Sequence, residues 1–484
     1  MELVVGLDIG TTAVKAVLFQ RDGTVLAIAE KLVTTYYPEP GWAEQDPVEV
    51  ESKALEALRD VIQHSAVKRE SIKAIGISCA MHSLICVNET GKALSNALIW
   101  SDGRAKMQAD ALSKKEIGAR LYDKTGVPIH PMSPLVKLIW MKETGFNAYK
   151  QASHFISLKE YILFHWFGER MIDYAMASAT GLFNKDTLRW EQEALVLAGI
   201  TEAQLSNVVA PTEVLNGIRV EVAEKIGILK ETTFVIGAAD GQLANLGIGA
   251  ILPGEVAITV GTSGAVRQLV KDSRLSKQQG TFCYAFTEQY KIVGGPTNNG
   301  GIVVQWLKEV LHNEDEMEDF LKKAETVNVG ADGLFFIPYI NGERAPIWNQ
   351  NATGSFYGLK ITHTQNFIIR AVLEGITLNL YEIYQDVKQI AGEPERIFVN
   401  GGLARSKTWL QLVADIFGKE VCIAESPQSS AWGAAWIALV GIGVEHTLEA
   451  IKDSIHIEKI IKPNVENHSK YKRIYEEWKK LIQK

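Results

Sequence analysis

Two copies of one short pattern, separated by about half of the chain, constrain what this sequence can fold into. Each copy has an apolar segment, a small polar turn and a second apolar segment, at residues 4–19 and 256–266. The turns are Gly10-Thr11-Thr12 and Gly261-Thr262-Ser263. Short apolar segments around such turns predict β-hairpins. A repeated pattern indicates a duplicated domain, and two such hairpins facing one cleft would hold the phosphates of a nucleotide from both sides.

The first turn has the residue types that suit a phosphate and a metal ion. Gly10 lets the backbone approach a ligand closely, and Thr11 and Thr12 offer hydroxyl and N–H donors. Asp8 precedes the turn and is suited to hold Mg²⁺ through its water shell. The alternative is an ordinary hairpin turn with an exposed aspartate.

At the position that corresponds to Asp8, the second half of the chain has neutral residues. In place of the aspartate it has Thr259 or Val260, so we expect the halves to be alike in shape but not in charge. A glycine-rich turn then leads into a helix predicted over 302–311. Gly301 and Gln305 lie on its first turns, where they can approach a nucleotide.

Asp240 follows a predicted strand at 233–238 and precedes Gly241 and a helix of small residues. A carboxylate at a strand end is well placed to accept a proton from a substrate hydroxyl. A helix N-cap is an equally good interpretation. We place the domain boundary just after this segment, which predicts domains of 1–245 and 246–484.

Further polar residues follow other strands. His82 comes after the strand predicted at 72–78, at a place where α/β proteins position ligand contacts. It could donate a hydrogen bond to a substrate hydroxyl or carboxylate, although a lone histidine is more often a satisfied core or loop residue. The adjacent Glu343 and Arg344 are expected to form a structural pair. The proline-dense loop at 126–134 is suited to shape a pocket wall.

Composition narrows the class of protein. A chain of 484 residues is too long for a single core and suggests at least two domains. With 46% hydrophobic and 22% charged residues it has the composition of a globular protein, and its net charge of −7 argues against a nucleic-acid surface. The four cysteines form no metal or disulfide pattern. No targeting segment or membrane-spanning run is found, so we expect a cytoplasmic protein.

Taken together, the motifs resemble those of the FGGY family of carbohydrate kinases over essentially the whole chain. The segments that carry the resemblance are Asp8-Ile9-Gly10-Thr11-Thr12, Ala80-Met81-His82, Asp240-Gly241-Gln242, Gly261-Thr262-Ser263, Gly354-Ser355-Phe356-Tyr357-Gly358-Leu359 and Asn400-Gly401-Gly402. The resemblance implies an α/β fold of two actin-like ATPase (ribonuclease H-like) domains with a cleft between them. It also implies that the N-terminal domain binds the sugar and the C-terminal domain binds ATP.

The resemblance implies a role for each matching residue. Asp240 is the general base and also contacts the sugar, together with Met81 and His82. Asp8 helps to hold Mg²⁺. The positions that match nucleotide-contacting residues of the family are Thr11, Thr12, Lys15, Gly261, Thr262, Gly301, Gln305, Gly402 and Ser406. Lys15 stands where glycerol kinases have an arginine, and Ser406 where they have an asparagine.

Within the family, residues 41–47 and the proline-dense loop are most similar to members that phosphorylate D-gluconate to 6-phospho-D-gluconate. A gluconate pocket should offer a cation or several donors, and His82 and His130 are candidates. Met81-His82 is also similar to xylulokinases, so a ketose kinase is the first alternative. An actin-like ATPase that works as a chaperone or scaffold is the second. The P-loop type of gluconokinase is excluded because its motif is absent from the sequence. We expect a small-molecule substrate, no nucleic acid and no membrane; a homodimer is compatible with the sequence.

Overall fold

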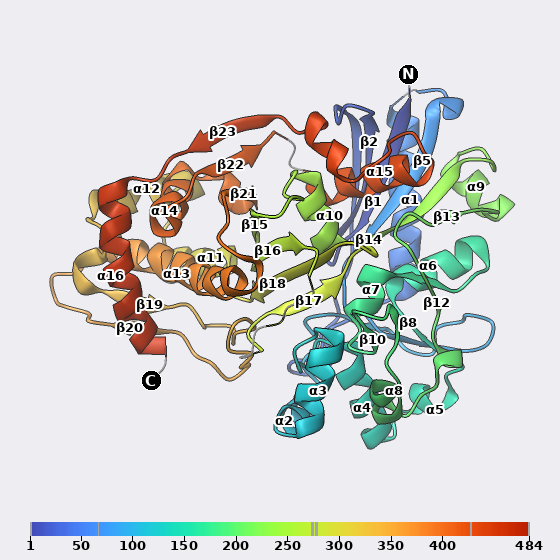
Figure 1. Ribbon diagram of the computed structural model, residues 1–484, viewed down its shortest axis with the longest axis horizontal. Helices are drawn as coiled ribbons and strands as arrows, with labels where there is room; N and C mark the ends of the chain where they lie inside the picture. The colour runs from blue at the N-terminus through green and yellow to red at the C-terminus, as the bar shows by residue number, and fades with distance from the viewer. Residues whose placement is uncertain (1, 66, 273–274, 276–278, 426–427, 483–484) are drawn as a thin grey trace.

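The computed structural model describes residues 2–65, 67–272, 275, 279–425 and 428–482. Its strands form two large sheets, one on each side of the molecule (Figure 1). The sheet of the first half has the order β13-β14-β5-β1-β2-β3. Its strands are β1 (Leu3–Ile9), β2 (Ala13–Gln20), β3 (Val25–Leu32), β5 (Ile72–Cys79), β13 (Val214–Leu215) and β14 (Thr233–Ala239).

The sheet of the second half has the order β17-β18-β16-β15-β21-β22-β23. Its strands are β15 (Glu255–Val260), β16 (Gly264–Val270), β17 (Phe282–Ala285), β18 (Lys291–Thr297), β21 (Arg396–Gly401), β22 (Val421–Ala424) and β23 (Ile457–Ile461). Five smaller sheets have two strands each. They pair β4 (Glu44–Gln45) with β7 (Ala97–Leu98), β6 (Ile85–Val87) with β8 (His154–Ile156), β9 (Met171–Asp173) with β12 (Asn207–Val209), β10 (Phe183–Asn184) with β11 (Arg189–Trp190) and β19 (Phe335–Ile337) with β20 (Ser355–Tyr357).

The two large sheets share one connectivity, which confirms the predicted duplication of shape. In the first half, β1 pairs antiparallel with β2 and parallel with β5. In the second half, β15 pairs antiparallel with β16 and parallel with β21 in the same way. Both Gly-Thr turns therefore connect the two strands of a hairpin, as the sequence predicts.

The strand register identifies the counterpart of Asp8. Asp8 is the last but one residue paired in the β1–β2 hairpin, and it faces Ser78 of β5. Thr259 has the same place in the β15–β16 hairpin, and it faces Asn400 of β21. Of the two residues that the sequence left open, Thr259 is therefore the one that replaces the acid.

The helices agree with most of the predicted segments. They are α1 (Pro47–His64), α2 (Lys106–Ser113), α3 (Glu116–Thr125), α4 (Pro134–Thr144), α5 (Asn147–Gln151), α6 (Leu158–Phe167), α7 (Tyr174–Ser178), α8 (Gln192–Ala198), α9 (Val220–Ile226), α10 (Asp240–Gly247), α11 (Gly301–Val310), α12 (Met317–Lys322), α13 (Gln365–Ala391), α14 (Lys407–Phe417), α15 (Ser429–Gly441) and α16 (Val465–Ile482). Asp173 caps the short helix α7 by accepting two backbone N–H groups. The predicted division at 245/246 falls inside α10 and stays a prediction.

Helix α15 belongs to the second half in sequence but packs on the sheet of the first half. In Figure 1 the red α15 lies among the blue strands β1 and β5. Two glycines allow this close approach: a Cβ atom on Gly6 would lie 1.9 Å from the carbonyl oxygen of Ala431, and one on Gly76 would lie 1.9 Å from that of Ala434. The core of the first sheet therefore needs a helix that the chain supplies only near its end.

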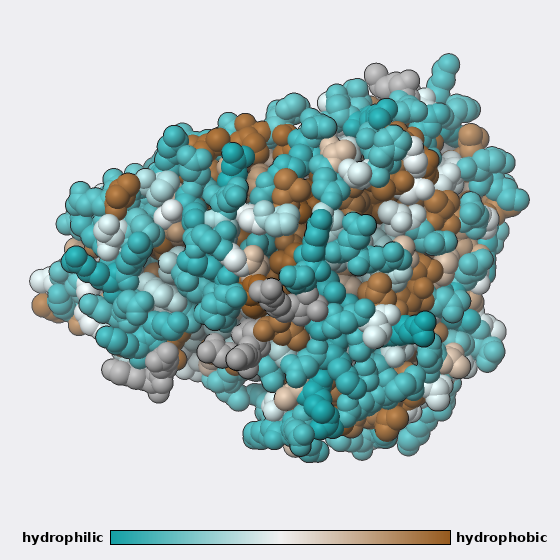
Figure 2. Space-filling view, in the orientation of Figure 1, coloured by the Kyte–Doolittle hydropathy of each residue, from teal (hydrophilic) through white to brown (hydrophobic). Residues whose placement is uncertain are grey.

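The surface is mainly polar. Hydrophilic side chains cover most of the face seen in Figure 2, with hydrophobic side chains scattered among them. Among the described residues, every helix is too short or too polar to cross a membrane. The four cysteines are free and buried.

Candidate functional site

A cavity of 570 Å³ lies between the two Gly-Thr turns. Seven of the residues selected from the sequence line it: Thr11, Thr12, Met81, His82, Asp240, Gly261 and Thr262. They come from the β1–β2 turn, the segment after β5, the start of α10 and the β15–β16 turn. The fold thus brings both turns, the expected base and the expected sugar contacts to one place.

Asp240 is the first residue of α10 and lines this cavity. Its carboxylate accepts the backbone N–H of Gly241 at 2.7 Å. Burial and the negative charge of Asp8 raise the pKa of Asp240 to about 6, although the Arg267 guanidinium acts in the opposite direction. The residue before it, Ala239, is the N-cap, so the interpretation of Asp240 as the cap is wrong. A carboxylate with this pKa is suited to general-base chemistry near neutral pH.

Asp8 lies beside the cavity at the end of β1. Its carboxylate accepts a hydrogen bond from the Ser78 hydroxyl at 2.7 Å, and burial raises its pKa. Mg²⁺ usually keeps several waters and binds one or two carboxylates together with substrate phosphates. Asp8 lies near Asp240 and close in sequence to the turn that carries Thr11 and Thr12. This arrangement fits that mode of Mg²⁺ binding.

His82 has a different hydrogen-bonding role from the one expected. Its Nδ1 lies 2.8 Å from the carbonyl oxygen of Ala179. Because a carbonyl only accepts, Nδ1 carries the proton. Burial lowers the pKa of His82 to about 3, so the ring is neutral and Nε2 is an acceptor. His82 can accept a bond from a sugar hydroxyl, but it cannot donate to a hydroxyl or carboxylate as predicted.

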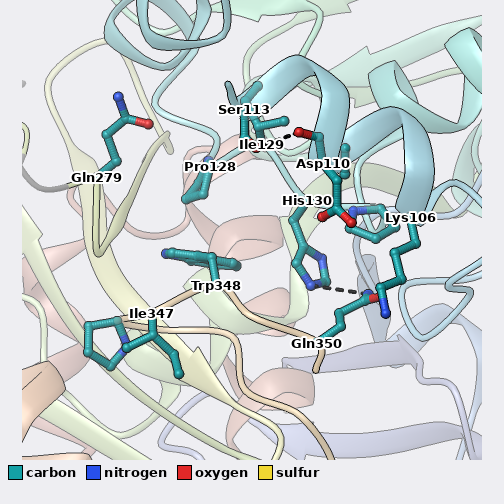
Figure 3. Close-up of a pocket in the computed structure, with 13 residues that line it drawn as sticks. Lys106, Asp110, Ser113, Pro128, Ile129, His130, Gln279, Ile347, Trp348 and Gln350 are labelled. Carbon is teal, nitrogen blue, oxygen red and sulfur yellow. Dashed lines mark hydrogen bonds between the residues drawn. The ribbon is translucent and has the colours of Figure 1, made fainter. Parts of the chain in front are cut away.

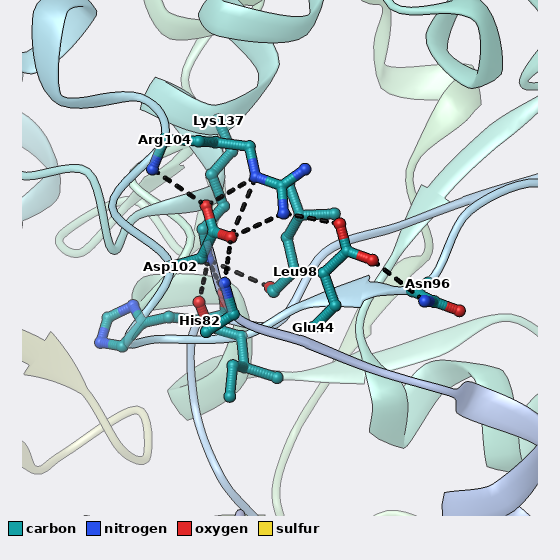
Figure 4. A network of polar contacts seen from close by, with 9 residues as sticks. Glu44, His82, Asn96, Leu98, Asp102, Arg104 and Lys137 are labelled. Carbon is teal, nitrogen blue, oxygen red and sulfur yellow. Dashed lines mark hydrogen bonds and ion pairs between the residues drawn. The ribbon is translucent and has the colours of Figure 1, made fainter. Parts of the chain in front are cut away.

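A buried lysine holds the turn that carries His82. The ammonium group of Lys137, on α4, donates to the backbone carbonyls of His82 at 2.7 Å, Leu98 at 3.1 Å and Ile99 at 2.7 Å. Figure 4 shows these bonds converging on one nitrogen. They fix His82, whose φ of 69° lies in the left-handed region, next to the segment that leads to Trp100.

The neighbouring polar network is structural. Arg104 donates to Asp102 at 2.7 Å and to Glu44 at 2.6 Å (Figure 4). Its guanidinium also lies over the Trp42 ring, 3.8 Å from the centroid. Asp102 and Arg104 therefore pair with each other.

His130 does not line the cavity between the two Gly-Thr turns; it lines a separate cavity of 240 Å³ (Figure 3) and another of 760 Å³. Its Nδ1 accepts the backbone N–H of Met132 at 3.1 Å, and its Nε2 lies 3.4 Å from the Gln350 side-chain nitrogen. Burial lowers its pKa to about 3. His82 and His130 are therefore both neutral, and neither supplies the cation that an acid sugar would need.

Two arginines of the second half supply positive charge to the cavity. Arg267, on β16, and Arg344, on the loop after β19, both line it. Arg267 was not predicted as a site residue, although a lone arginine within the apolar strand Gly264–Val270 was a usable signal. Glu343 and Arg344 were expected to form a structural pair. The Glu343 carboxylate does accept the backbone N–H of Arg344 at 2.7 Å, together with bonds from Thr297, at 2.7 Å, and from nearby amides, while the Arg344 side chain lines the cavity.

The remaining nucleotide candidates are more scattered. Gly301 lies beside the second turn, where its N–H donates to the Gly261 carbonyl at 2.8 Å, and a Cβ on Gly402 would lie 3.5 Å from the carbonyl oxygen of Val260 at the end of β15. Gln305 is exposed on α11. Two candidates have structural partners of their own. The Lys15 ammonium lies 3.6 Å from the Glu30 carboxylate, and the buried Ser406 hydroxyl caps α14 by accepting the N–H of Trp409.

Comparisons with known proteins agree with this architecture. The N-terminal domain model of the FGGY family of carbohydrate kinases matches residues 3–247, and the C-terminal domain model matches residues 256–442. A gluconokinase of Bacillus licheniformis is 39% identical over 482 residues, which cover 97% of this chain and 94% of that protein.

Two solved structures from Lactobacillus acidophilus, described as a gluconate kinase and as a ligand-bound xylulose kinase, also match. Each is 35% identical with a TM-score of 0.96, and the match covers 100% of this chain and 98% of the other. The expected fold of two actin-like ATPase domains is confirmed by this likeness.

Proposed function

The chain belongs to the FGGY family of carbohydrate kinases, and from this membership we propose that it transfers the γ-phosphoryl group of ATP to D-gluconate. The product is 6-phospho-D-gluconate. The relative from Bacillus licheniformis supports this substrate, as does the positive charge that Arg267 and Arg344 bring to the cavity. A ketose such as D-xylulose would bring no negative charge to meet them.

The observation that carries the proposal is the position of Asp240 in the cavity between the two turns, with a pKa of about 6. In the proposed step the hydroxyl on C6 attacks the γ-phosphorus in line. The O6–P bond forms, the bond to the β-phosphate bridging oxygen breaks, and the hydroxyl proton passes to the Asp240 carboxylate. ADP leaves with the displaced electron pair. Positioning and charge neutralisation account for most of the catalysis of such a transfer.

Each remaining residue has a binding role in this proposal. Met81 packs against the sugar, and His82 accepts a bond from one of its hydroxyls. The residues proposed to bind ATP are Thr11, Thr12, Lys15, Gly261, Thr262, Gly301, Gln305, Gly402 and Ser406. Thr11 and Thr262 face the cavity from opposite turns and are suited to donate to phosphate oxygens. For Lys15 and Ser406, binding requires that each side chain leave the partner described above.

Asp8 is proposed to hold Mg²⁺, with Asp240 as a neighbouring carboxylate. When bound, the ion would neutralise phosphate charge. Closure of the two domains would keep water away from the phosphoryl group. A homodimer and a cytoplasmic location stay predictions.

The test is ADP release by the purified protein with D-gluconate, D-xylulose, glycerol and L-ribulose. We expect kcat/KM for D-gluconate to exceed the others by at least about 100-fold. A preference for D-xylulose would keep the fold and the base but assign the protein to the ketose kinases. Binding of ATP without turnover of any sugar would contradict the kinase assignment.

A further inference from the structure

Three buried polar groups on one side of the cavity have no hydrogen-bond partner among the described residues. They are Nε of Arg267, Nε of Arg344 and the hydroxyl of Tyr284, and all three side chains line the same cavity. A buried donor without a partner is costly to a protein unless a ligand satisfies it. The set consists of two cationic donors and one neutral donor, which together suit an anion.

Arg267 has more unused bonding capacity than Arg344. A guanidinium has five N–H donors. Among the described residues, the one hydrogen bond of the Arg267 guanidinium is a long bond of 3.4 Å from Nη1 to the Thr259 hydroxyl, beside its attraction to the Asp240 carboxylate. Arg344 donates to the carbonyl oxygen of Thr297 at 3.1 Å, and its guanidinium lies over the Trp100 ring, 4.8 Å from the centroid. Arg344 is therefore held more firmly by the protein than Arg267.

The surroundings of Arg267 place it on the substrate side of the cavity. A Cβ on Gly241 would lie 3.1 Å from Nε of Arg267 and 3.3 Å from the terminal methyl of Met81. Its neighbours thus include the expected sugar contact Met81 and the first turn of the helix that begins with Asp240. The stacked ring pair of Phe282 and Tyr284, with centroids 4.3 Å apart, forms another part of the wall.

We propose that Arg267, together with the Tyr284 hydroxyl, binds the carboxylate of the sugar acid and makes the site specific for acids over neutral sugars. This inference rests on the proposed kinase function. A carboxylate accepts two N–H groups of a guanidinium side by side, and it would relieve the repulsion between the two arginines. A ketose leaves the guanidinium without this partner, so the same cavity would bind it less well.

The experiment compares two substrates that differ only at C1: D-gluconate, and D-glucitol, in which an alcohol replaces the carboxylate. The variants are Arg267→Gln and Arg267→Lys, and kcat and KM are measured for both substrates. If D-glucitol is turned over too slowly, its inhibition constant is measured instead. We expect Arg267→Gln to lower kcat/KM for D-gluconate about 100-fold, mainly through KM. The kcat/KM for D-glucitol should change by less than about threefold. The kcat/KM of Arg267→Lys for D-gluconate should lie between those of the wild type and Arg267→Gln.

Two further variants serve as comparisons. Tyr284→Phe removes only a hydroxyl and should cost D-gluconate about tenfold, and it keeps the proposal testable if Arg267→Gln does not fold. Lys106→Gln removes a cation that lines the smaller neighbouring cavity, and we expect both substrates to be unaffected. If Lys106→Gln lowers kcat/KM for both substrates, any cation near the site would have the same effect, which contradicts a direct contact of Arg267 with the carboxylate.

Three results would overturn the assignment. An equal loss for both substrates in Arg267→Gln would show that Arg267 acts only through Asp240, whose pKa it lowers, and not on the carboxylate of the sugar acid. A selective loss in Arg344→Gln and not in Arg267→Gln would assign the carboxylate to the other guanidinium. Retention of D-gluconate selectivity in both Arg267→Gln and Tyr284→Phe would exclude the proposed pair. Failure of the proposed function is distinguishable, because the wild-type protein would then not phosphorylate D-gluconate.

Discussion

The two hairpins share one geometry but differ in charge. At the residue before the end of the first strand, the first half has Asp8 beside Ser78, whereas the second half has Thr259 beside Asn400. Thr259 is contacted by the guanidinium of Arg267. The first half thus contributes a negative charge to the cavity, and the second half contributes positive charge. The comparison shows how a duplicated shape can bind one ligand from two sides: the acid suits a metal ion, and the arginines suit an anion.

The largest effect is expected at the carboxylate between the halves. Asp240→Asn keeps the size of the side chain but removes the base, so kcat should fall by about 10³-fold or more. Binding of D-gluconate, measured by calorimetry, should stay within about threefold of the wild type, because an amide keeps most hydrogen bonds. Turnover close to that of the wild type would refute the assignment of Asp240 as the base.

The charge difference between the two hairpins can be tested at the equivalent positions. Asp8→Asn should lower kcat by about 10²-fold and raise the Mg²⁺ concentration needed for half-maximal activity, because it removes the proposed ligand. Thr259→Val removes a weakly bonded hydroxyl and should cost about threefold or less. Steady-state kinetics at several Mg²⁺ concentrations measures both. Equal losses of kcat in the two variants would mean that the charge difference between the hairpins does not affect activity.

The packing on the two sheets also differs at equivalent positions. Gly6 and Gly76 are paired on neighbouring strands of the first sheet. Ala257 and Phe398 occupy the equivalent paired positions in the second sheet. Gly76→Ala would put a methyl group into the backbone of α15, so we expect a loss of about 3 kcal/mol in the free energy of unfolding.

The matched variant Ala257→Gly removes a methyl group and should cost about 1 kcal/mol. Thermal unfolding, read as the temperature of the first transition, compares the two variants. A Gly76→Ala protein as stable as the wild type would show that α15 is not seated on the first sheet as described.

The smallest effect is expected from pH. The pKa of Asp240 is raised to about 6, so its carboxylate takes up a proton as the pH falls through that value, and the protonated form cannot act as a base. At pH 5, kcat/KM for the sugar should be about tenfold lower than on the plateau near pH 8. A limb near pH 4 would show that burial and Asp8 do not raise the pKa of Asp240 in the free enzyme. Unfolding measured at pH 5 separates this loss from instability.

Much of the site could be predicted from the sequence because it lies at turns with local signatures. Gly10-Thr11-Thr12 and Asp240 each follow an apolar strand of the first sheet, where the register of parallel strands brings the strand ends to one edge. Gly261-Thr262 follows an apolar strand of the second sheet. Arg267 stands out in the sequence as a lone arginine within an apolar strand, but its role was missed because it depends on which groups surround it in the folded protein. The histidines were assigned as donors because the sequence does not show the carbonyl and N–H groups that fix their tautomers.

The sequence by itself determined the duplicated hairpins, the α/β class and the acid at the first turn, since these depend on residues close together in the chain. Only the tertiary structure decided that Thr259 is the counterpart of Asp8, because the counterpart is defined by pairing with strands far away. It also decided that α15 completes the first sheet, and that arginines instead of histidines supply the positive charge. These outcomes depend on burial and long-range contact, which act on a side chain only after the two halves have come together.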